Sequence, residues 1–136
     1  MKIFRNVLAV ILGIFIGGSV NMALINVSGS IIPPPEGADL TTMEGLTTAM
    51  HLFEPKHFIM PFVAHAFGTL VGAIIAGLVA ATHKKKFALS IGTVFLLGGI
   101  MMVIQLPAPL WYNCVDLILA YIPMALLGAK ISSPRK

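Results

Sequence analysis

Residues 7–27 read VLAVILGIFIGGSVNMALINV, an apolar run of 21 residues without a charged side chain. An α-helix rises about 1.5 Å per residue, so about 20 residues cross the roughly 30 Å hydrocarbon core of a bilayer. The run is therefore long enough to span a membrane. Lys2 and Arg5 precede it, as basic residues precede both signal peptides and uncleaved anchors. Because a signal peptide has an apolar region of only about 7–15 residues, we predict an uncleaved anchor, although Ser28-Gly29-Ser30 leaves cleavage open.

Three further apolar runs follow, at residues 58–81, 87–106 and 110–129. None alternates polar with apolar residues as a barrel strand does, whereas helices satisfy their own backbone hydrogen bonds in lipid. The chain is 57% hydrophobic and only 10% charged, with a mean hydropathy of +0.95, which is unlike a soluble domain. We predict an all-α polytopic membrane protein: a four-transmembrane-helix bundle that forms one domain over residues 1–136 in contact with the lipid bilayer.

The basic residues are distributed unevenly between the two ends of this predicted bundle. Eight of the nine lysines and arginines flank one end, and Lys56 alone flanks the other. Because basic flanks are retained in the cytoplasm, we predict cytoplasmic N- and C-termini in a bacterial inner (cytoplasmic) membrane, with anionic lipids as partners of the cytoplasmic face. No nucleic-acid motif accompanies the positive charge, so binding of nucleic acid is not expected. The eight residues are Lys2, Arg5, Lys84, Lys85, Lys86, Lys130, Arg135 and Lys136.

The first external loop, residues 28–57, contains a predicted short amphipathic helix at about residues 41–54. Thr41 and Glu44 match a capping box, in which Thr41 caps the helix and Glu44 reaches back to it. Apolar side chains recur at helical spacing and form one face. This face would either lie on the membrane surface or pack as a lid over the bundle, and the pattern leaves both open. It consists of Met43, Leu46, Met50 and Phe53.

The same loop contains the spacing His51-x-x-Glu54-x-x-His57, which has residue types that bind zinc. Pro55 lies inside the motif, and a helix cannot run straight through a proline. The three side chains are therefore not required to converge. We predict a solvated loop and no metal site.

Each predicted span carries a polar side chain in the half nearer this loop. His65 lies roughly 10 Å inside the second span and Asp116 roughly 9 Å inside the fourth, at about 1.5 Å per residue. An aspartate at membrane depth costs on the order of 3 kcal/mol, so a partner is expected. We predict that the two residues form a coupled pair that binds a proton, a cation or a polar headgroup. The alternative is a purely structural hydrogen bond or a contact at the level of the lipid headgroups. The candidate substrate- or ion-binding residues are His65, Asp116, Asn21, Asn113 and Gln105.

Small residues indicate where helices meet. Gly13, Gly17 and Asn21 recur at every fourth position of the first span, and Gly68 and Gly72 form a similar pair in the second. Such small-xxx-small patterns allow two helix backbones to approach closely. The contact is expected within the chain, and the same pattern leaves a homo-oligomer open.

Two prolines and two aromatic residues modify the spans. Pro61 and Pro123 lie within the second and fourth spans and are expected to kink them. Trp111 and Tyr112 lie at the start of the fourth span, where aromatic side chains commonly anchor a helix at the membrane interface.

Residues 52–58, Pro61, residues 65–68 and residues 106–116 together resemble small bacterial four-helix integral membrane proteins. The resemblance implies a fold and a location but no activity. The chain departs from three named four-helix groups. It lacks the first-helix glutamate of small multidrug resistance transporters, the paired cysteines of disulfide-bond oxidoreductases, and the intramembrane arginine and glutamate of glutathione-using membrane enzymes.

Three functions are consistent with these observations. The first is a small transporter, channel or ligand-binding subunit that uses the polar half of the bundle. The second is a membrane-embedded enzyme acting on a lipid or quinone, with His65 as acid or base and Asp116 orienting it. The third is a structural subunit that docks a partner through the external loop. No residue is assigned as catalytic, and no cofactor is implied.

Overall fold

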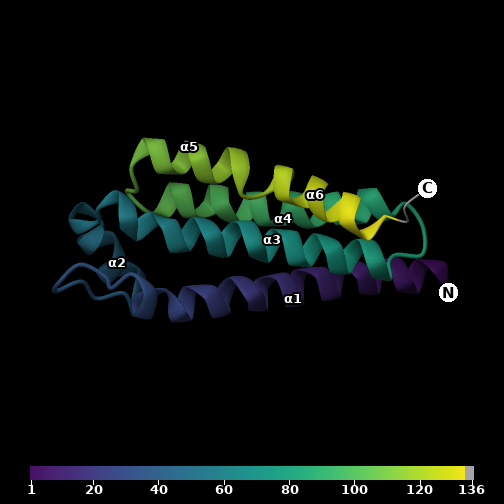
Figure 1. Ribbon diagram of the computed structural model, residues 1–136, viewed down its shortest axis with the longest axis horizontal. Helices are drawn as coiled ribbons and strands as arrows, with labels where there is room; N and C mark the ends of the chain where they lie inside the picture. The colour runs from purple at the N-terminus through teal and green to yellow at the C-terminus, as the bar shows by residue number, and fades with distance from the viewer. Residues whose placement is uncertain (134–136) are drawn as a thin grey trace.

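The computed structural model describes residues 1–133, and these residues form helices joined by short loops (Figure 1). The four helices predicted to cross the membrane are confirmed among them: each is long and apolar enough to do so. The fourth span is divided into two helices. The elements of the bundle are α1 (Lys2–Ile31), α3 (Ile59–Val79), α4 (Lys84–Gln105), α5 (Leu110–Leu119) and α6 (Ile122–Ser132).

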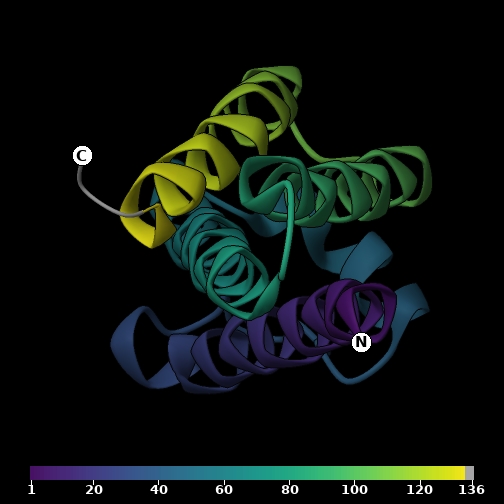
Figure 2. The ribbon, with the colours of Figure 1, turned by 90° about the vertical axis from the view of Figure 1, so that its right-hand side faces the viewer.

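The bundle is elongated, with α3 between α1 on one side and α4 with α6 on the other (Figures 1 and 2). One end carries residues 32–58 and the turn at residues 106–109, and we call it the loop end. The opposite end carries the turn at residues 80–83, which precedes Lys84, and we call it the lysine end. α1 begins and α6 finishes at the lysine end (Figure 1).

α1 and α3 approach closely because glycines face one another across their interface. A methyl group added to Gly17 would come within 2.6 Å of the Gly68 carbonyl oxygen. One added to Gly72 would come within 2.6 Å of the Gly13 carbonyl oxygen. Backbone atoms cannot move aside as a flexible side chain can, so the predicted small-residue contact is present and leaves no room for a larger residue.

α1 is longer than the predicted span of residues 7–27. Its 30 residues extend over about 45 Å. Ser28, which was expected in the loop, lies in the helix and donates its hydroxyl hydrogen to the Ile25 carbonyl oxygen at 2.6 Å. The helix ends at Ile31 because Pro33 follows shortly after, and the residue before a proline disfavours the helical conformation.

The predicted loop helix is present but shorter than residues 41–54, and its cap was predicted at the wrong residue. It consists of α2 (Met43–Ala49) followed by a single 3₁₀ turn at Met50–Leu52. Thr42 rather than Thr41 is the N-cap, since its hydroxyl oxygen accepts a hydrogen bond from the Gly45 N–H at 2.9 Å. Thr41 instead donates its hydroxyl hydrogen to Asp39 Oδ1 at 2.6 Å.

The apolar face of this helix packs as a lid on the loop end of the bundle. Met50 is buried together with Phe58 and Tyr112, and Leu46 and Phe53 pack against the same cluster. The Phe58 and Tyr112 rings lie 4.6 Å apart between centroids. Tyr112 is therefore a buried residue of the loop end rather than an interfacial anchor like its exposed neighbour Trp111. Met43, expected on the same face, stays exposed.

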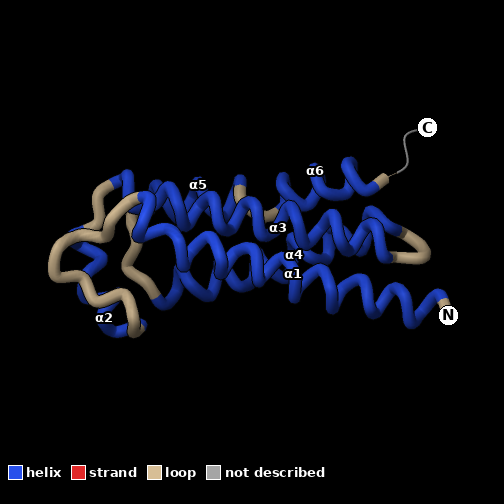
Figure 3. The backbone as a smooth tube through the Cα atoms, turned by 60° about the horizontal axis from the view of Figure 1, so that its bottom comes forward, coloured by secondary structure: helices blue, strands red, loops and turns tan. Residues whose placement is uncertain are grey.

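The two prolines affect their helices differently. Pro123 lacks the N–H that would bond to the Leu119 carbonyl, and the helix is interrupted at Ala120 and Tyr121, between α5 and α6 (Figure 3). Pro61 lies in the first turn of α3, where backbone N–H groups have no helical partner. The fourth span is thus broken before Pro123, whereas α3 continues without interruption after Pro61.

The N-terminus of α1 holds the turn between α3 and α4. Arg5 donates two hydrogen bonds to the Val79 carbonyl oxygen, at 3.0 and 3.2 Å. Asn6 Oδ1 accepts from the backbone N–H groups of Ala81 and Thr82 at 2.9 and 3.3 Å, and its amide donates to the Thr82 hydroxyl at 2.8 Å. Arg5 thus donates to a carbonyl oxygen at the C-terminus of α3, and it also contributes positive charge at the lysine end.

Gly72→Ala is predicted to destabilise the protein by about 1–3 kcal/mol, because the new methyl group meets the Gly13 backbone and the two helices must separate. Gly18→Ala is the matched control, since a methyl group there would meet no atom within 4 Å. It is expected to be neutral or stabilising by up to about 1 kcal/mol through helix propensity. Chemical unfolding in detergent micelles, followed by circular dichroism, measures both changes. Equal stability of the two variants would contradict the proposed packing.

Asn6→Ala is predicted to lower the free energy of unfolding by about 1–3 kcal/mol, because the N–H groups of Ala81 and Thr82 lose their acceptor. Asn26→Ala is the control, since Asn26 is an exposed residue of the same helix. The same unfolding measurement applies. A loss of stability no larger than that of the control would show that the turn does not depend on Asn6.

Candidate functional site

The predicted partners His65 and Asp116 are in contact. His65 on α3 and Asp116 on α5 are joined by a hydrogen bond of 2.8 Å between Nδ1 and Oδ1. Tyr121 donates its hydroxyl hydrogen to the other carboxylate oxygen, Oδ2, at 2.9 Å. Asp116 is 4% exposed. An ionised carboxylate accepts on both oxygens, and with Asp116 in that form Nδ1 of His65 is the donor and Nε2 is left for other partners.

Tyr121 reaches Asp116 because the fourth span is broken. In an unbroken helix two residues five positions apart point about 140° away from each other. Tyr121 lies at the interruption before α6, with φ −113° and ψ −76°, and its ring turns back toward α5. Its ring also stacks on the His65 ring, with 5.8 Å between centroids. We refer to His65, Asp116 and Tyr121 as the polar triad.

Gly99 on α4 makes space for the tyrosine. A methyl group at this position would come within 2.6 Å of the Tyr121 hydroxyl oxygen and 2.8 Å of its ring. Neither Gly99 nor Tyr121 was among the residues predicted for the site. Pro123, two positions after Tyr121, was the sequence signal that could have identified the tyrosine, because a proline predicts a helix break next to this polar residue.

The polar triad borders a pocket of about 270 Å³ between α1, α3 and α4. His65 and Tyr121 line it from one side, and Asn21 on α1 lines it from another. The side-chain oxygen of Asn21 is buried and has no hydrogen-bond partner among residues 1–133. Buried polar atoms are nearly always bonded, so an unpaired oxygen on a residue that lines a pocket calls for an explanation such as a ligand or water.

Two of the predicted site residues lie elsewhere. Asn113 donates from Nδ2 to the Ala108 carbonyl oxygen at 3.4 Å, within the turn that precedes α5. Gln105 is exposed at the last residue of α4. The structure therefore brings together His65, Asp116 and Asn21 but not Asn113 or Gln105. These two lie nearer the end of the bundle, where water is available to satisfy them.

The three residues of the His51-x-x-Glu54-x-x-His57 motif are engaged locally. His51 Nδ1 bonds to the Thr48 carbonyl oxygen at 2.8 Å, and His57 Nδ1 accepts from the Glu54 N–H at 2.8 Å. Glu54 pairs with Lys56 at 3.4 Å. In the part of the chain that the structure describes, no group of three or more His, Cys, Asp or Glu residues is arranged to hold a metal ion.

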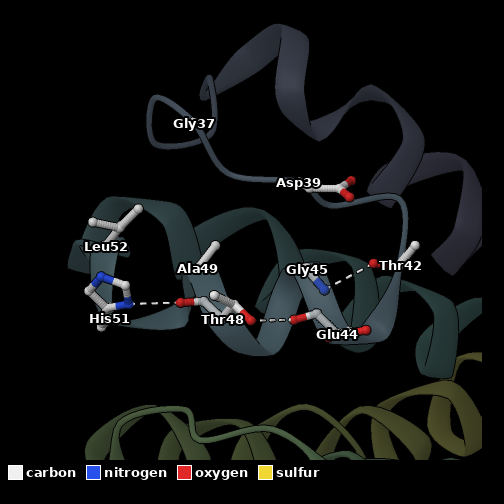
Figure 4. Close-up of a pocket in the computed structure, with 9 residues that line it drawn as sticks. All are labelled: Gly37, Asp39, Thr42, Glu44, Gly45, Thr48, Ala49, His51 and Leu52. Atoms are coloured by element: carbon white, nitrogen blue, oxygen red, sulfur yellow. Dashed lines mark hydrogen bonds between the residues drawn. The ribbon is translucent and has the colours of Figure 1, made fainter.

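A second hollow, of about 370 Å³, lies between α2 and the segment that precedes it (Figure 4). Asp39 borders it from this segment, and Glu44 and His51 border it from the helix. The carboxylate of Asp39 already accepts hydrogen bonds from the hydroxyl and the N–H of Thr41. His51 is held by the Thr48 carbonyl oxygen, as Figure 4 shows. The polar groups of this hollow thus bond mainly within the loop.

No protein-family model, curated protein or solved structure matches this chain.

The pKa of Asp39 lies below its ordinary value of 3.8, first because of the Thr41 hydroxyl and second because of the Thr41 N–H. Thr41→Val is predicted to raise this pKa toward 3.8, and Thr48→Val, whose hydroxyl bonds only to the Glu44 carbonyl oxygen, to leave it unchanged. Because the folded pKa is depressed, the stabilisation by Thr41 is present above the unfolded pKa and is lost as pH falls through the folded one. Carboxyl-carbon NMR titration measures the shift. An Asp39 pKa that is unaffected by Thr41→Val would contradict the assignment.

Proposed function

We propose that this protein is a small integral membrane ligand-binding subunit, of the kind used in transport, whose site is the pocket beside His65, Asp116 and Tyr121. The observation that supports it best is the position of the buried carboxylate of Asp116, which is hydrogen-bonded to His65 and Tyr121, two residues that line a pocket of about 270 Å³. Ionisable residues inside membrane helices are costly, and they usually serve a function. Apolar packing would close the same space at lower cost.

A bound polar group would also complete the hydrogen bonding of the site. With Nδ1 bonded to Asp116, His65 keeps Nε2 free, and Asn21 keeps an unpaired oxygen. The polar triad carries one negative charge when His65 is neutral. A proton on His65 or a cationic group in the pocket would balance it, as expected of a site that binds a proton, a cation or a headgroup.

A binding site fits these observations better than an open pore. Toward the lysine end, the helices are packed through small, fully buried side chains of α3, α4 and α6. Ile91 fills the space between them and is completely buried. A ligand held by the triad would therefore need a conformational change, or a second chain, to cross the membrane. The small side chains are Ala73, Ala76, Ala88, Ala125 and Ala129.

We propose that the protein resides in a bacterial inner membrane with the loop end outside and both termini in the cytoplasm. Lys2 and Arg5 lie with Lys84 at the lysine end, which suits the cytoplasmic face and anionic lipid headgroups. Homo-oligomerisation is also compatible with the bundle, because α1 exposes an apolar surface along its length. This surface includes Phe4, Ile11 and Phe15.

One alternative is an enzyme that acts on a lipid or quinone. It is supported by the orientation of His65, because a histidine whose Nδ1 is bonded to a carboxylate presents Nε2 as a general acid or base. Docking of a partner through the external loop has less support, since Leu46, Met50 and Phe53 are already packed against the bundle.

The ligand-binding proposal predicts that a small molecule from a bacterial membrane extract stays bound to the purified protein. His65→Ala and Asp116→Ala, separately and together, are expected to reduce its occupancy at least about tenfold, because each removes one side of the hydrogen-bonded pair. Native mass spectrometry from detergent measures the occupancy. Thr93→Ala, an exposed position on α4, is the matched control and should bind normally. The proposal fails if the two single variants fold and retain the molecule at native occupancy, or if the native protein retains none.

A further inference from the structure

We propose that the pocket binds the ammonium group of a membrane-dissolved primary amine, which enters sideways from the lipid between α1 and α4. This inference rests on the proposed function and names its ligand class and route. It follows from three features of the described residues: where the pocket opens, which atoms face it, and what charge lies behind it.

The pocket opens on the side of the bundle. Val94 and Met102, two residues of α4 that line it, are 40% and 36% exposed. Between them along the helix lies Gly98, which is also exposed. Facing this stretch is Gly18 of α1, and a methyl group on either glycine would meet no atom within 4 Å. The surface of a membrane-spanning bundle at this level faces lipid, so the opening does too.

The route from the loop end is closed by contrast. Met50, Phe58 and Tyr112 are all buried where the lid meets the bundle, and Phe62 packs against them one turn before His65 on α3. A water-borne solute would have to displace this cluster to reach the polar triad. A molecule dissolved in the bilayer meets no such cluster. Figure 1 shows that the lid lies over the end of the bundle and leaves its long sides uncovered.

The two residues of the polar triad that line the pocket, His65 and Tyr121, can each offer it a hydrogen-bond acceptor. The Tyr121 hydroxyl hydrogen is donated to Asp116, so only its oxygen lone pairs remain. In the neutral tautomer that donates from Nδ1 to the Asp116 carboxylate, His65 presents Nε2 as an acceptor. Asn21, which also lines the pocket, has a buried side-chain oxygen without a partner among residues 1–133. A primary ammonium group has three N–H donors and no acceptor, and it therefore matches this set.

The charge of the site favours the same group. The salt bridges formed by described residues are Lys56 with Glu54 and His65 with Asp116, so no lysine or arginine neutralises Asp116. A cation placed against the triad would balance the buried carboxylate in surroundings where an uncompensated charge is expensive. The hydrocarbon tail of an amphiphile would leave the pocket past Val94 and Met102, which are apolar. The volume of about 270 Å³ exceeds the roughly 30 Å³ occupied by one water molecule, so a headgroup fits.

Three probes test the ligand class: dodecylamine, dodecyltrimethylammonium and ethylamine. The protein is placed in phosphatidylcholine nanodiscs, and the ¹⁵N resonance of His65 Nε2, assigned by its loss in His65→Gln, is followed during titration. Dodecylamine is expected to shift the resonance to saturation. Dodecyltrimethylammonium has the same charge but no N–H donor, and it should bind at least about tenfold more weakly. Ethylamine has the ammonium group but stays in water, and it should give no shift at equal concentration.

Substitutions at the opening test the route. Gly98→Leu places a side chain in the mouth of the pocket without a clash and is expected to weaken dodecylamine binding at least about tenfold. Thr93→Leu, on an exposed part of α4 outside the pocket lining, is the control and should bind normally. Asn21→Leu should also weaken binding, since it removes an acceptor.

Each contrary result overturns a stated part of the inference. Equal binding of dodecylamine and dodecyltrimethylammonium would refute recognition of the ammonium N–H groups. Entry from the lipid would be refuted if ethylamine bound as tightly as dodecylamine, or if Gly98→Leu bound dodecylamine as tightly as the native protein. If no amine binds but the molecule detected by native mass spectrometry still depends on His65, then the ligand class is wrong and the proposed function stands. If no amine binds, and the native protein also retains no molecule that depends on His65, both proposals are rejected.

Discussion

The close packing of α3 is the constraint on which the other features of this bundle depend. α3 presents small side chains to the helices around it, and the backbones approach until carbonyl oxygens lie where a methyl group would need to fit, as at Gly68 and Gly72. Lipid supplies little apolar driving force between helices, so van der Waals contact of this kind must hold the bundle together. A central helix with so narrow a surface allows α1, α4 and α6 to pack closely around it. His65, on the same helix, is thereby placed within reach of both Asp116 and the pocket bordered by Asn21.

The polar triad combines two properties that conflict in a membrane. The triad buries the carboxylate of Asp116, and a pocket lies beside His65 and Tyr121. The break before Pro123 reconciles them, because it lets Tyr121 turn back to bond Asp116 while Gly99 provides the space for its ring. Hydrogen bonds to His65 and Tyr121 hold the carboxylate, and these two residues also line the pocket. A structural hydrogen bond alone would not require this vacant volume, which is why the arrangement favours a binding site.

The lid changes how such a site is reached. The position of the polar residues along the spans predicted that the half of the bundle nearer the external loop would be open to water. The packing of Met50 against Phe58 and Tyr112 covers that end, and the pocket opens on the side of the bundle instead. We propose that the site therefore prefers ligands that dissolve in the bilayer.

The residue order by itself determined the number of spans and the small-residue contact of the first two, and it indicated His65 and Asp116 as partners. These follow from periodicity, from apolar length and from the cost of isolated charge, all of which act locally or at a fixed depth. Only the tertiary structure decided that Asn21 joins the pair while Asn113 and Gln105 do not, that Tyr121 completes the triad, and that the loop helix is a lid. Depth along a span is readable from sequence, but the direction in which a side chain points depends on the rotation of each helix about its axis. That rotation is set by packing against neighbours and, in the fourth span, by a break whose geometry no single residue specifies.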